Sequence, residues 1–330
     1  MSTLRLTLAC CNYDRTRALV DGRVRPEGID LNCLDLPVEE TFFRMLRHRE
    51  FDVAEMSLSS YVMSLCQPRP PFIAIPVFPS RAFRHSGIYV HTGSGIRTAQ
   101  DLIGRRVGTA EYQLTAAVWI RGILAEHYGV PVESMTYFTG GQEEPGRLEK
   151  LPIALPTGIR LERIGSGDTL SAMLASGAID ALFAPRAPSS LHTSPGTVTR
   201  LFEDFMTVER DYFRLTGIFP IMHTLVIRRD VYERDRWVAQ SLHKAWCAAQ
   251  QETYRDLRET AALKTMLPWL VAHVEETRRE MGDDFWPYGL EPNRRTLETF
   301  LRYSYEQGLS KDLLSPDRLF APETLASFRI

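Results

Sequence analysis

The chain has 330 residues, and its 39 Lys and Arg against 41 Asp and Glu give a formal net charge of −2 at pH 7. This length allows two domains, and the balanced charge argues against nucleic acid or an anionic membrane surface as the main partner. The five cysteines include the adjacent pair Cys10-Cys11 but no CxxC motif. They form neither a disulfide framework nor a zinc signature and are typical of reduced thiols.

No uninterrupted apolar run approaches the roughly 20 residues of a membrane-spanning helix. The N-terminal apolar run, Leu6 to Cys11, is short for a secretory signal and does not lead to a small-residue cleavage site. We therefore expect a soluble, cytoplasmic protein that has no membrane partner.

Helical and strand-like patterns alternate along the first two thirds of the chain, which predicts an α/β fold. In chain order, strands are predicted at 4–10, 29–34, 51–54, 72–77, 87–90, 107–109 and 225–227, with helices at 41–47 and 115–127. The last third is predicted to be helical at 237–257, 263–274 and 294–307, with a packed tail from 315 to 330.

A short internal similarity suggests two related lobes. Residues 45–54 and 173–182 share the order Met-Leu, four residues, then a run of four with Asp at its second position. Each reads as a helix, a polar turn and a strand, and open α/β sheets bind ligands beyond the carboxyl ends of their strands. That cleft would receive Glu55, Ser57, Pro185 and Arg186. We place one lobe at 1–93 and 222–330, the other at 94–221, and the ligand cleft between them.

Two arginines, a histidine and serines gather in the connection Phe78–Ser86, between two predicted strands. Arg81 and Arg84 can grip carboxylates bidentately, while His85 can exchange a proton near neutral pH. The alternative is a solvated loop with a capping histidine. With Ser86, this segment predicts a site that binds and protonates an anion.

A second candidate segment follows the strand at 107–109 and begins the next helix. It contains Glu111, Tyr112 and Gln113, and backbone N–H groups at a helix start favour anions. Simple N-terminal capping of the helix would explain the same residues. Two further candidates are Arg147, which ends a glycine-rich stretch, and His223, in an apolar run at a predicted crossing between lobes. The first could belong to a surface turn, and the second could be a core histidine.

The common catalytic motifs are absent, because the chain has no HExxH, GxxxxGK[ST] or GxSxG and no GxGxxG after a strand. Four stretches are distinctive instead: VFPSRAFRHSGIYV at 77–90, EYQLTAAVW at 111–119, GIFPIMHTLVIRRD at 217–230, and DDFWPYG at 283–289 with Asn293-Arg294. These stretches closely resemble the 4,5-dihydroxyphthalate decarboxylase family. The similarity extends from Tyr13-Asp14-Arg15-Thr16 to Glu306-Gln307-Gly308-Leu309, which is nearly the whole chain.

The resemblance implies a two-lobed type II periplasmic-binding-protein-like fold with two crossover strands and a helical C-terminal region. It also implies decarboxylation of 4,5-dihydroxyphthalate to protocatechuate in phthalate catabolism, with an aromatic dicarboxylate as the small-molecule partner, and favours a homo-oligomer. Binding proteins share such folds, so a solute-binding protein for a carboxylate is one alternative. A decarboxylase of a related hydroxylated aromatic acid is another.

Losing CO2 from an aromatic ring requires an acid that protonates the ring carbon and a hydroxyl that supplies electron density. We assign the acid to His85 or His223, whose best pKa lies near the working pH. Glu111, helped by Tyr112, would polarise the ring hydroxyls. The residues expected to hold the substrate are Arg81, Arg84, Arg147, Arg186, Ser86, Gln113 and Arg15. No cofactor is required, although a divalent metal held by His85, Glu111 and His223 stays open.

Overall fold

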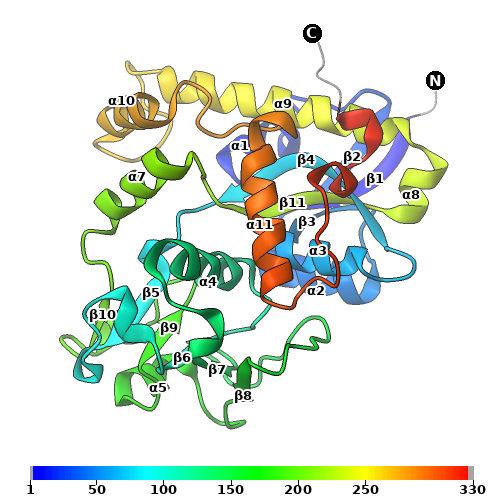
Figure 1. The fold of residues 1–330 in the computed structure, drawn as a ribbon. Coiled ribbons are helices and arrows are strands. Elements are labelled where there is room, and N and C mark those ends of the chain that lie inside the picture. Colours follow the sequence, from blue (N-terminus) through cyan, green and yellow to red (C-terminus); the bar gives the residue numbers. More distant parts are fainter. Residues whose placement is uncertain (1–2, 326–330) are drawn as a thin grey trace.

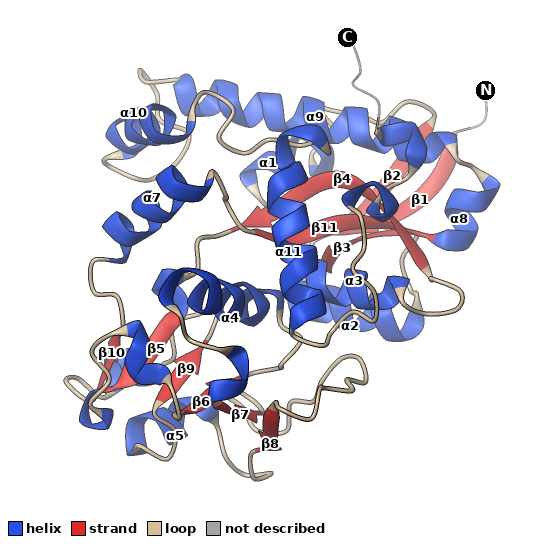
Figure 2. Ribbon diagram, in the orientation of Figure 1, coloured by secondary structure: helices blue, strands red, loops and turns tan. Residues whose placement is uncertain are grey.

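Two β-sheets with flanking helices make up the two halves of the computed structural model, which describes residues 3–325 (Figures 1 and 2). The first sheet has the strand order β2-β1-β3-β11-β4. Its strands are β1 (Leu4–Ala9), β2 (Ile29–Leu34), β3 (Val53–Ser57), β4 (Phe72–Arg81) and β11 (Ile221–Arg228). Strand β1 pairs in parallel with β2 and β3, whereas β11 runs antiparallel to β3 and β4.

The second sheet has the order β10-β5-β9-β6-β7-β8. Its strands are β5 (Ile88–His91), β6 (Arg106–Thr109), β7 (Thr136–Thr139), β8 (Arg160–Arg163), β9 (Ala181–Phe183) and β10 (Val198–Arg200). Parallel pairing of β9, β6, β7 and β8 brings the carboxyl ends of these strands to one edge, where loops can converge on a ligand.

Helices cover both sheets (Figure 2). In the first half they are α1 (Asp14–Val20), α2 (Val38–His48), α3 (Leu58–Leu65), α8 (Arg229–Arg234), α9 (Trp237–Arg258), α10 (Leu270–Met281) and α11 (Arg294–Glu306). In the second half they are α4 (Thr115–Tyr128), α5 (Leu170–Ser176), α6 (Ser190–Thr193) and α7 (Phe205–Thr216). Helix α2 has Glu39 and Glu40 in its first turn and Arg47 and His48 in its last, which complements the helix dipole.

The C-terminal helix α11 joins the two halves because it packs against α4 (Figure 1). Trp119 is fully buried there, and its Nε1 donates to the carbonyl oxygen of Ile221 at 2.9 Å. At Gly122, an added Cβ would lie 2.1 Å from the Tyr303 ring. Only glycine allows these two helices to approach so closely.

The chain crosses from the first sheet to the second after β4 and returns to it between α7 and β11. The boundary proposed from the sequence at 93/94 would leave β5 in the first lobe, but β5 pairs with β9 and β10 of the second sheet. The first crossing therefore occurs within residues 82–87. The return lies at the start of β11, next to the proposed boundary at 221/222.

The predicted strands are all present, with shifts of a few residues at their ends. The helix expected at 263–274 begins instead at Leu270. Pro268 explains the difference, because proline in a helix interior removes a hydrogen bond and clashes with the preceding turn. Residues 326–330 of the predicted tail lie outside the described residues. Within 3–325, no helix is both long enough and apolar enough to cross a membrane.

Candidate active site

A cavity of about 230 Å³ lies between the two sheets. Its walls come from α2 and the ends of β3 and β4 on one side, and from the start of α4 and two loops of the second half on the other. The lining side chains are those of Tyr13, Val38, Glu39, Phe42, Ser57, Ser80, Arg84, Leu114, Thr115, Ala116, Arg147, Lys150, Pro185, Arg186, Met222 and His223. Of the four residues predicted to meet at one cleft, Ser57, Pro185 and Arg186 line this cavity, whereas Glu55 is fully buried and is absent from its lining.

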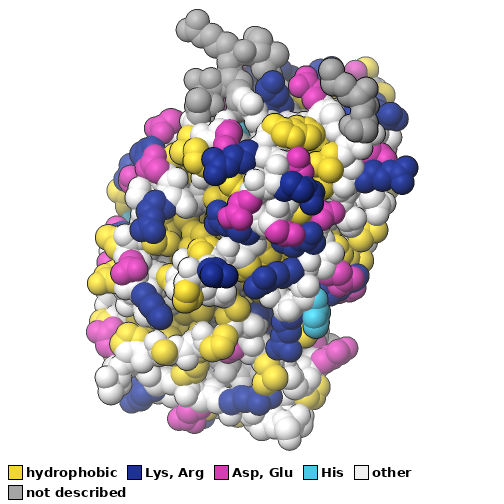
Figure 3. All heavy atoms as spheres, turned by 90° about the vertical axis from the view of Figure 1, so that its right-hand side faces the viewer, with side chains coloured by type: hydrophobic (Ala, Val, Ile, Leu, Met, Phe, Trp, Pro, Cys, Tyr) yellow, Lys and Arg dark blue, Asp and Glu magenta, His cyan; other side chains and the backbone are white. Residues whose placement is uncertain are grey.

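Positive charge dominates the cavity wall, which carries Arg84, Arg147, Lys150 and Arg186 against the single carboxylate of Glu39. On the face shown in Figure 3, by contrast, cationic and anionic side chains are interspersed. Arg84 is buried, and its Nε contacts the Met222 Sδ at 3.0 Å. Burial lowers the pKa of Arg84 to about 10, so the guanidinium stays charged at neutral pH. The cavity is therefore suited to an anion.

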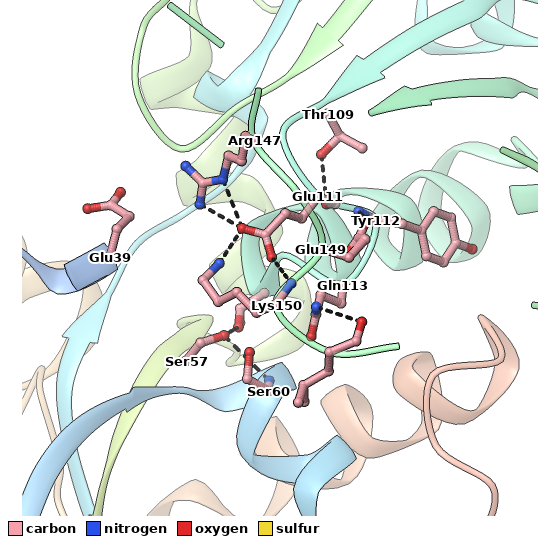
Figure 4. A network of polar contacts seen from close by, with 12 residues as sticks. Glu39, Ser57, Ser60, Thr109, Glu111, Tyr112, Gln113, Arg147, Glu149 and Lys150 are labelled. Carbon is pink, nitrogen blue, oxygen red and sulfur yellow. Dashed lines mark hydrogen bonds and ion pairs between the residues drawn. The ribbon is translucent and has the colours of Figure 1, made fainter. Parts of the chain in front are cut away.

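Glu111 lies behind this wall and holds two of its cations (Figure 4). Its Oε1 accepts from Arg147 Nε at 2.9 Å and from Lys150 Nζ, and its Oε2 accepts from the Lys150 backbone N–H at 3.1 Å. Burial lowers the pKa of Lys150, although Glu111 opposes the shift. Glu111 is thus a positioning residue for Arg147 and Lys150 and is absent from the cavity lining.

The buried carboxylate of Glu55 orients the His223 ring. Glu55 Oε1 lies 2.6 Å from His223 Nδ1 and accepts from the Tyr13 hydroxyl at 2.8 Å, while Oε2 accepts from the Cys11 N–H at 3.2 Å. Burial alone would raise the pKa of Glu55, but these donors outweigh it and the pKa is lowered. An ionised Glu55 requires the proton on His223 Nδ1, which leaves Nε2 as the nitrogen available to the cavity.

Two hydroxyls connect the halves at the cavity wall. Ser57 Oγ and Thr115 Oγ1 lie 2.8 Å apart, and Thr115 Oγ1 also accepts from the Ser59 N–H at 3.0 Å. Ser57 ends β3 and caps α3, whereas Thr115 begins α4. The pair fixes the starts of two helices from opposite halves beside the cavity.

Arg81 lies outside the cavity, although only two residues separate it from Arg84. Its guanidinium donates to the carbonyl oxygens of Phe219 at 3.1 Å and Pro287 at 2.7 Å, and to the Asn293 side chain. Burial lowers its pKa to about 9. Arg81 thus links the crossing segments to the C-terminal region and is not part of the proposed substrate clamp.

His85 is enclosed by aromatic rings and is also absent from the cavity lining. The rings of Tyr128, Phe202 and Tyr212 lie 5.8, 5.3 and 5.3 Å from its centroid, and neither of its nitrogens has a hydrogen-bond partner among the described residues. Burial, with a contribution from His127, lowers its pKa to about 4. His85 is therefore a neutral core side chain at pH 7.

Four further candidates also lie outside the cavity. Arg15 stacks on Tyr13 at 4.1 Å and donates to the Pro79 carbonyl oxygen at 2.6 Å. The Ser86 N–H donates to Glu209 at 2.9 Å. Tyr112 lies under the Arg121 guanidinium at 3.8 Å, and Gln113 Nε2 donates to the Leu151 carbonyl oxygen at 3.4 Å.

Within the described part of the chain, no three His, Cys, Asp or Glu side chains are grouped to hold a metal ion. The set His85, Glu111 and His223 is therefore not assembled.

Comparison with curated proteins gives the family. A 4,5-dihydroxyphthalate decarboxylase of Comamonas testosteroni is 42% identical over 330 residues, covering 100% of both chains. The chain belongs to the 4,5-dihydroxyphthalate decarboxylase family. A second protein of that name, from Pseudomonas putida, is 45% identical over 214 residues, which are 65% of this chain and 83% of that protein. No protein-family model matches the chain.

Solved structures show the fold of this family member. The periplasmic sulfonate-binding protein SsuA of Methylobacillus flagellatus KT superposes with a TM-score of 0.56 at 12% identity, covering 97% of this chain and 92% of that one. The aliphatic sulphonate-binding protein SsuA of Escherichia coli gives 0.55 at 13%, covering 98% and 99%. The expected two-lobed type II periplasmic-binding-protein-like fold is confirmed.

Several side chains that line or support the cavity are absent from the site predicted from the sequence. Lys150 had one signal, since it is one of only four lysines in an arginine-rich chain. Tyr13 stands out in the sequence only at the start of the family resemblance, and Thr115 only at a predicted helix start. Glu39 and Phe42 had no signal, because their roles depend on which face of α2 meets the second half.

Proposed function

We propose that this protein decarboxylates 4,5-dihydroxyphthalate to protocatechuate and CO2, a carboxy-lyase reaction of phthalate catabolism. The observation that carries the proposal is a carboxylate-supported histidine in a cavity lined by four cations. An acid is needed to protonate the ring, and cations are needed to hold a dianion. The names of the relatives supply the substrate.

The cations and the apolar wall suggest different roles for the two carboxylates of the substrate. A carboxylate that is held by cations is stabilised against leaving as neutral CO2. We therefore place the retained carboxylate among Arg84, Arg147, Lys150 and Arg186, where charge-assisted hydrogen bonds are strongest. The departing carboxylate then faces the apolar wall, which includes Phe42, Leu114 and Met222. Water exclusion on that side favours loss of charge.

His223 acts as the general acid. Electron density from the hydroxyl para to the departing carboxylate moves onto the ring carbon that bears it, and His223 Nε2 delivers a proton to this carbon. The C–C bond then breaks, its electron pair returns to the ring, CO2 leaves, and the hydroxyl is restored. Glu55 positions the ring and stabilises the imidazolium before transfer, through the 2.6 Å contact to Nδ1. The net reaction consumes one proton for each CO2 released.

The test is CO2 release and product identity with metal-stripped protein in D2O, using 4,5-dihydroxyphthalate, 4-hydroxyphthalate and phthalate. We expect protocatechuate with one deuterium, on the ring carbon next to the retained carboxylate. Turnover only after a divalent metal is restored would keep the reaction and replace this mechanism. Unchanged ligand that binds tightly without CO2 release would instead make the protein a solute-binding protein.

The homo-oligomeric state and the cytoplasmic location stay predictions. Gel filtration with light scattering checks the first, and cell fractionation checks the second.

A further inference from the structure

Glu39 is the only carboxylate among the side chains that line the cavity, within residues 3–325. It lies in the first turn of α2, and Figure 4 shows it across the open space from Arg147 and Lys150. A carboxylate on the wall of an anion-binding cavity opposes the binding of a second negative group. A ligand group that donates hydrogen bonds would instead be favoured beside it.

The Glu39 carboxylate has capacity left for a ligand. It forms a bidentate pair with Arg186 of the second half, in which Nη1 contacts Oε1 and Nη2 contacts Oε2 at 3.1 Å. Each ionised carboxyl group has about four lone-pair sites, and Arg186 together with the backbone N–H of Glu39 occupies three of them, so one site remains for a ligand. Although burial raises the pKa of Glu39, the Arg186 hydrogen bond outweighs it and the pKa is lowered. At neutral pH Glu39 can only accept hydrogen bonds, for which the hydroxyls of a ligand are suitable donors.

Glu39 is also placed at the end of the cavity where a ring hydroxyl would lie. It precedes Phe42 by three residues on the same face of α2, a rise of about 4.5 Å, comparable to the span of one aromatic ring. The Phe42 ring packs edge-on against His223, with centroids 4.8 Å apart. A ring whose protonated carbon meets His223 would direct the hydroxyl on its far side, para to that carbon, toward Glu39.

We propose that Glu39 recognises the ring hydroxyl para to the departing carboxylate and thereby selects hydroxylated over unhydroxylated phthalates. This inference rests on the proposed function and adds the residue that sets its specificity. The hydrogen bond to the para hydroxyl also increases electron density on the oxygen that drives CO2 loss. The sequence had suggested Glu111 for this role, but both Glu111 oxygens are engaged by Arg147 and Lys150.

A different role for the same pair is a gate. Glu39 and Arg186 belong to opposite halves, and both also line an outer hollow of about 560 Å³. A gate would alter the entry of every ligand equally, whereas hydroxyl recognition alters only the hydroxylated ones. The ratio of affinities between ligands therefore separates the two roles.

The experiment compares wild type with Glu39→Gln, which keeps the shape but removes the charge. Glu40→Gln is the matched control, because Glu40 is the next residue on α2 and pairs with Arg44. Calorimetry gives the affinities for 4,5-dihydroxyphthalate and phthalate, and turnover gives kcat/KM for the former. We expect Glu39→Gln to weaken binding of 4,5-dihydroxyphthalate by about 10- to 100-fold, leaving phthalate binding unchanged or tighter. Glu40→Gln should match wild type with both ligands.

Equal losses for both ligands in Glu39→Gln would overturn hydroxyl recognition in favour of a gate. Arg186→Gln provides a second measurement that does not depend on the folding of the first variant. This variant should weaken the binding of both ligands and preserve the ratio of their affinities. A variant that binds the two ligands equally well would contradict the inference. Wild type that prefers 4,5-dihydroxyphthalate over phthalate yet releases no CO2 would overturn the proposed function alone. Wild type without that preference would overturn the Glu39 inference, whether or not CO2 is released.

Discussion

The surroundings of His85 and His223 show how two histidines from equally suggestive segments acquire opposite properties. His223 lies on β11 with Nδ1 against the buried carboxylate of Glu55, and its ring lines the cavity. His85 lies at the first crossing, among three aromatic rings and without a hydrogen-bond partner among the described residues. A buried imidazole without a carboxylate is held neutral, whereas an ionised carboxylate orients the ring that it contacts through its N–H.

The largest expected effect is the loss of turnover in His223→Asn. Removal of a general acid costs about 10²- to 10⁴-fold, and we expect kcat to fall by about 10³-fold with little change in substrate affinity. Steady-state assays of CO2 release measure it. The exposed His48 offers a matched control, since His48→Asn should retain full activity. A His223→Asn enzyme with near-normal kcat would remove His223 from the role of acid.

Protonation of His85 should instead affect how the free energy of unfolding depends on pH. Its pKa of about 4 in the folded state lies below the unfolded value of about 6.5, so the unfolded chain binds the proton first. His85 therefore costs nothing above pH 6.5, and about 3 kcal/mol of stability is lost as the pH falls from 6.5 to 4. Urea denaturation at several pH values should show a shallower loss in His85→Leu.

His243 provides the internal reference for that measurement, because burial lowers its pKa to about 4 as well. Wild type should lose stability through both histidines, and His85→Leu through His243 alone. A variant with the wild-type pH dependence would mean that His85 is not held neutral. Activity at pH 7.5 should be kept in the folded variant.

A smaller effect is expected from Glu55→Gln, which keeps His223 in place but removes its negative partner. We expect kcat to fall by about 10²-fold, because a neutral amide no longer stabilises the imidazolium. Assays of CO2 release across pH measure this fall, and the acid limb that depends on Glu55 ionisation should be absent from the variant. In wild type the lowered pKa of Glu55 keeps it ionised through the ordinary carboxyl range, so activity that needs this charge is lost only below that range. Glu50→Gln, at an exposed ion pair with Arg44, is the control. A Glu55→Gln profile identical to wild type would limit Glu55 to a structural role.

The smallest effects should separate two neighbouring arginines. Arg84→Gln removes a cation from the cavity, and we expect KM to rise by about 10-fold while thermal stability changes little. Arg81→Gln removes donors to Phe219 and Pro287, and we expect about 2 kcal/mol lower stability with a nearly normal KM. Thermal denaturation and substrate titration of both variants measure the contrast. The reverse pattern would return Arg81 to the substrate clamp.

Much of the architecture could be predicted from local pattern. Strand and helix periods gave the α/β class, and the similarity between residues 45–54 and 173–182 placed Ser57 and Arg186 on one cleft. These features depend on short-range spacing and on the rule that strand ends share an edge of the sheet. The full-length family resemblance added the type II fold, which the solved structures confirm.

The sequence by itself therefore determined the fold class, the two-lobed arrangement and several of the arginines and the histidine that line the cavity. Only the tertiary structure decided which of these residues face the cavity. Side-chain direction reverses within a few residues along a strand or turn, so Arg81 and Arg84 separate although they are close in sequence. The partner that distinguishes His223 from His85 is Glu55, which lies 168 positions away along the chain. Such long-range contacts fix protonation and orientation, and no local pattern contains them.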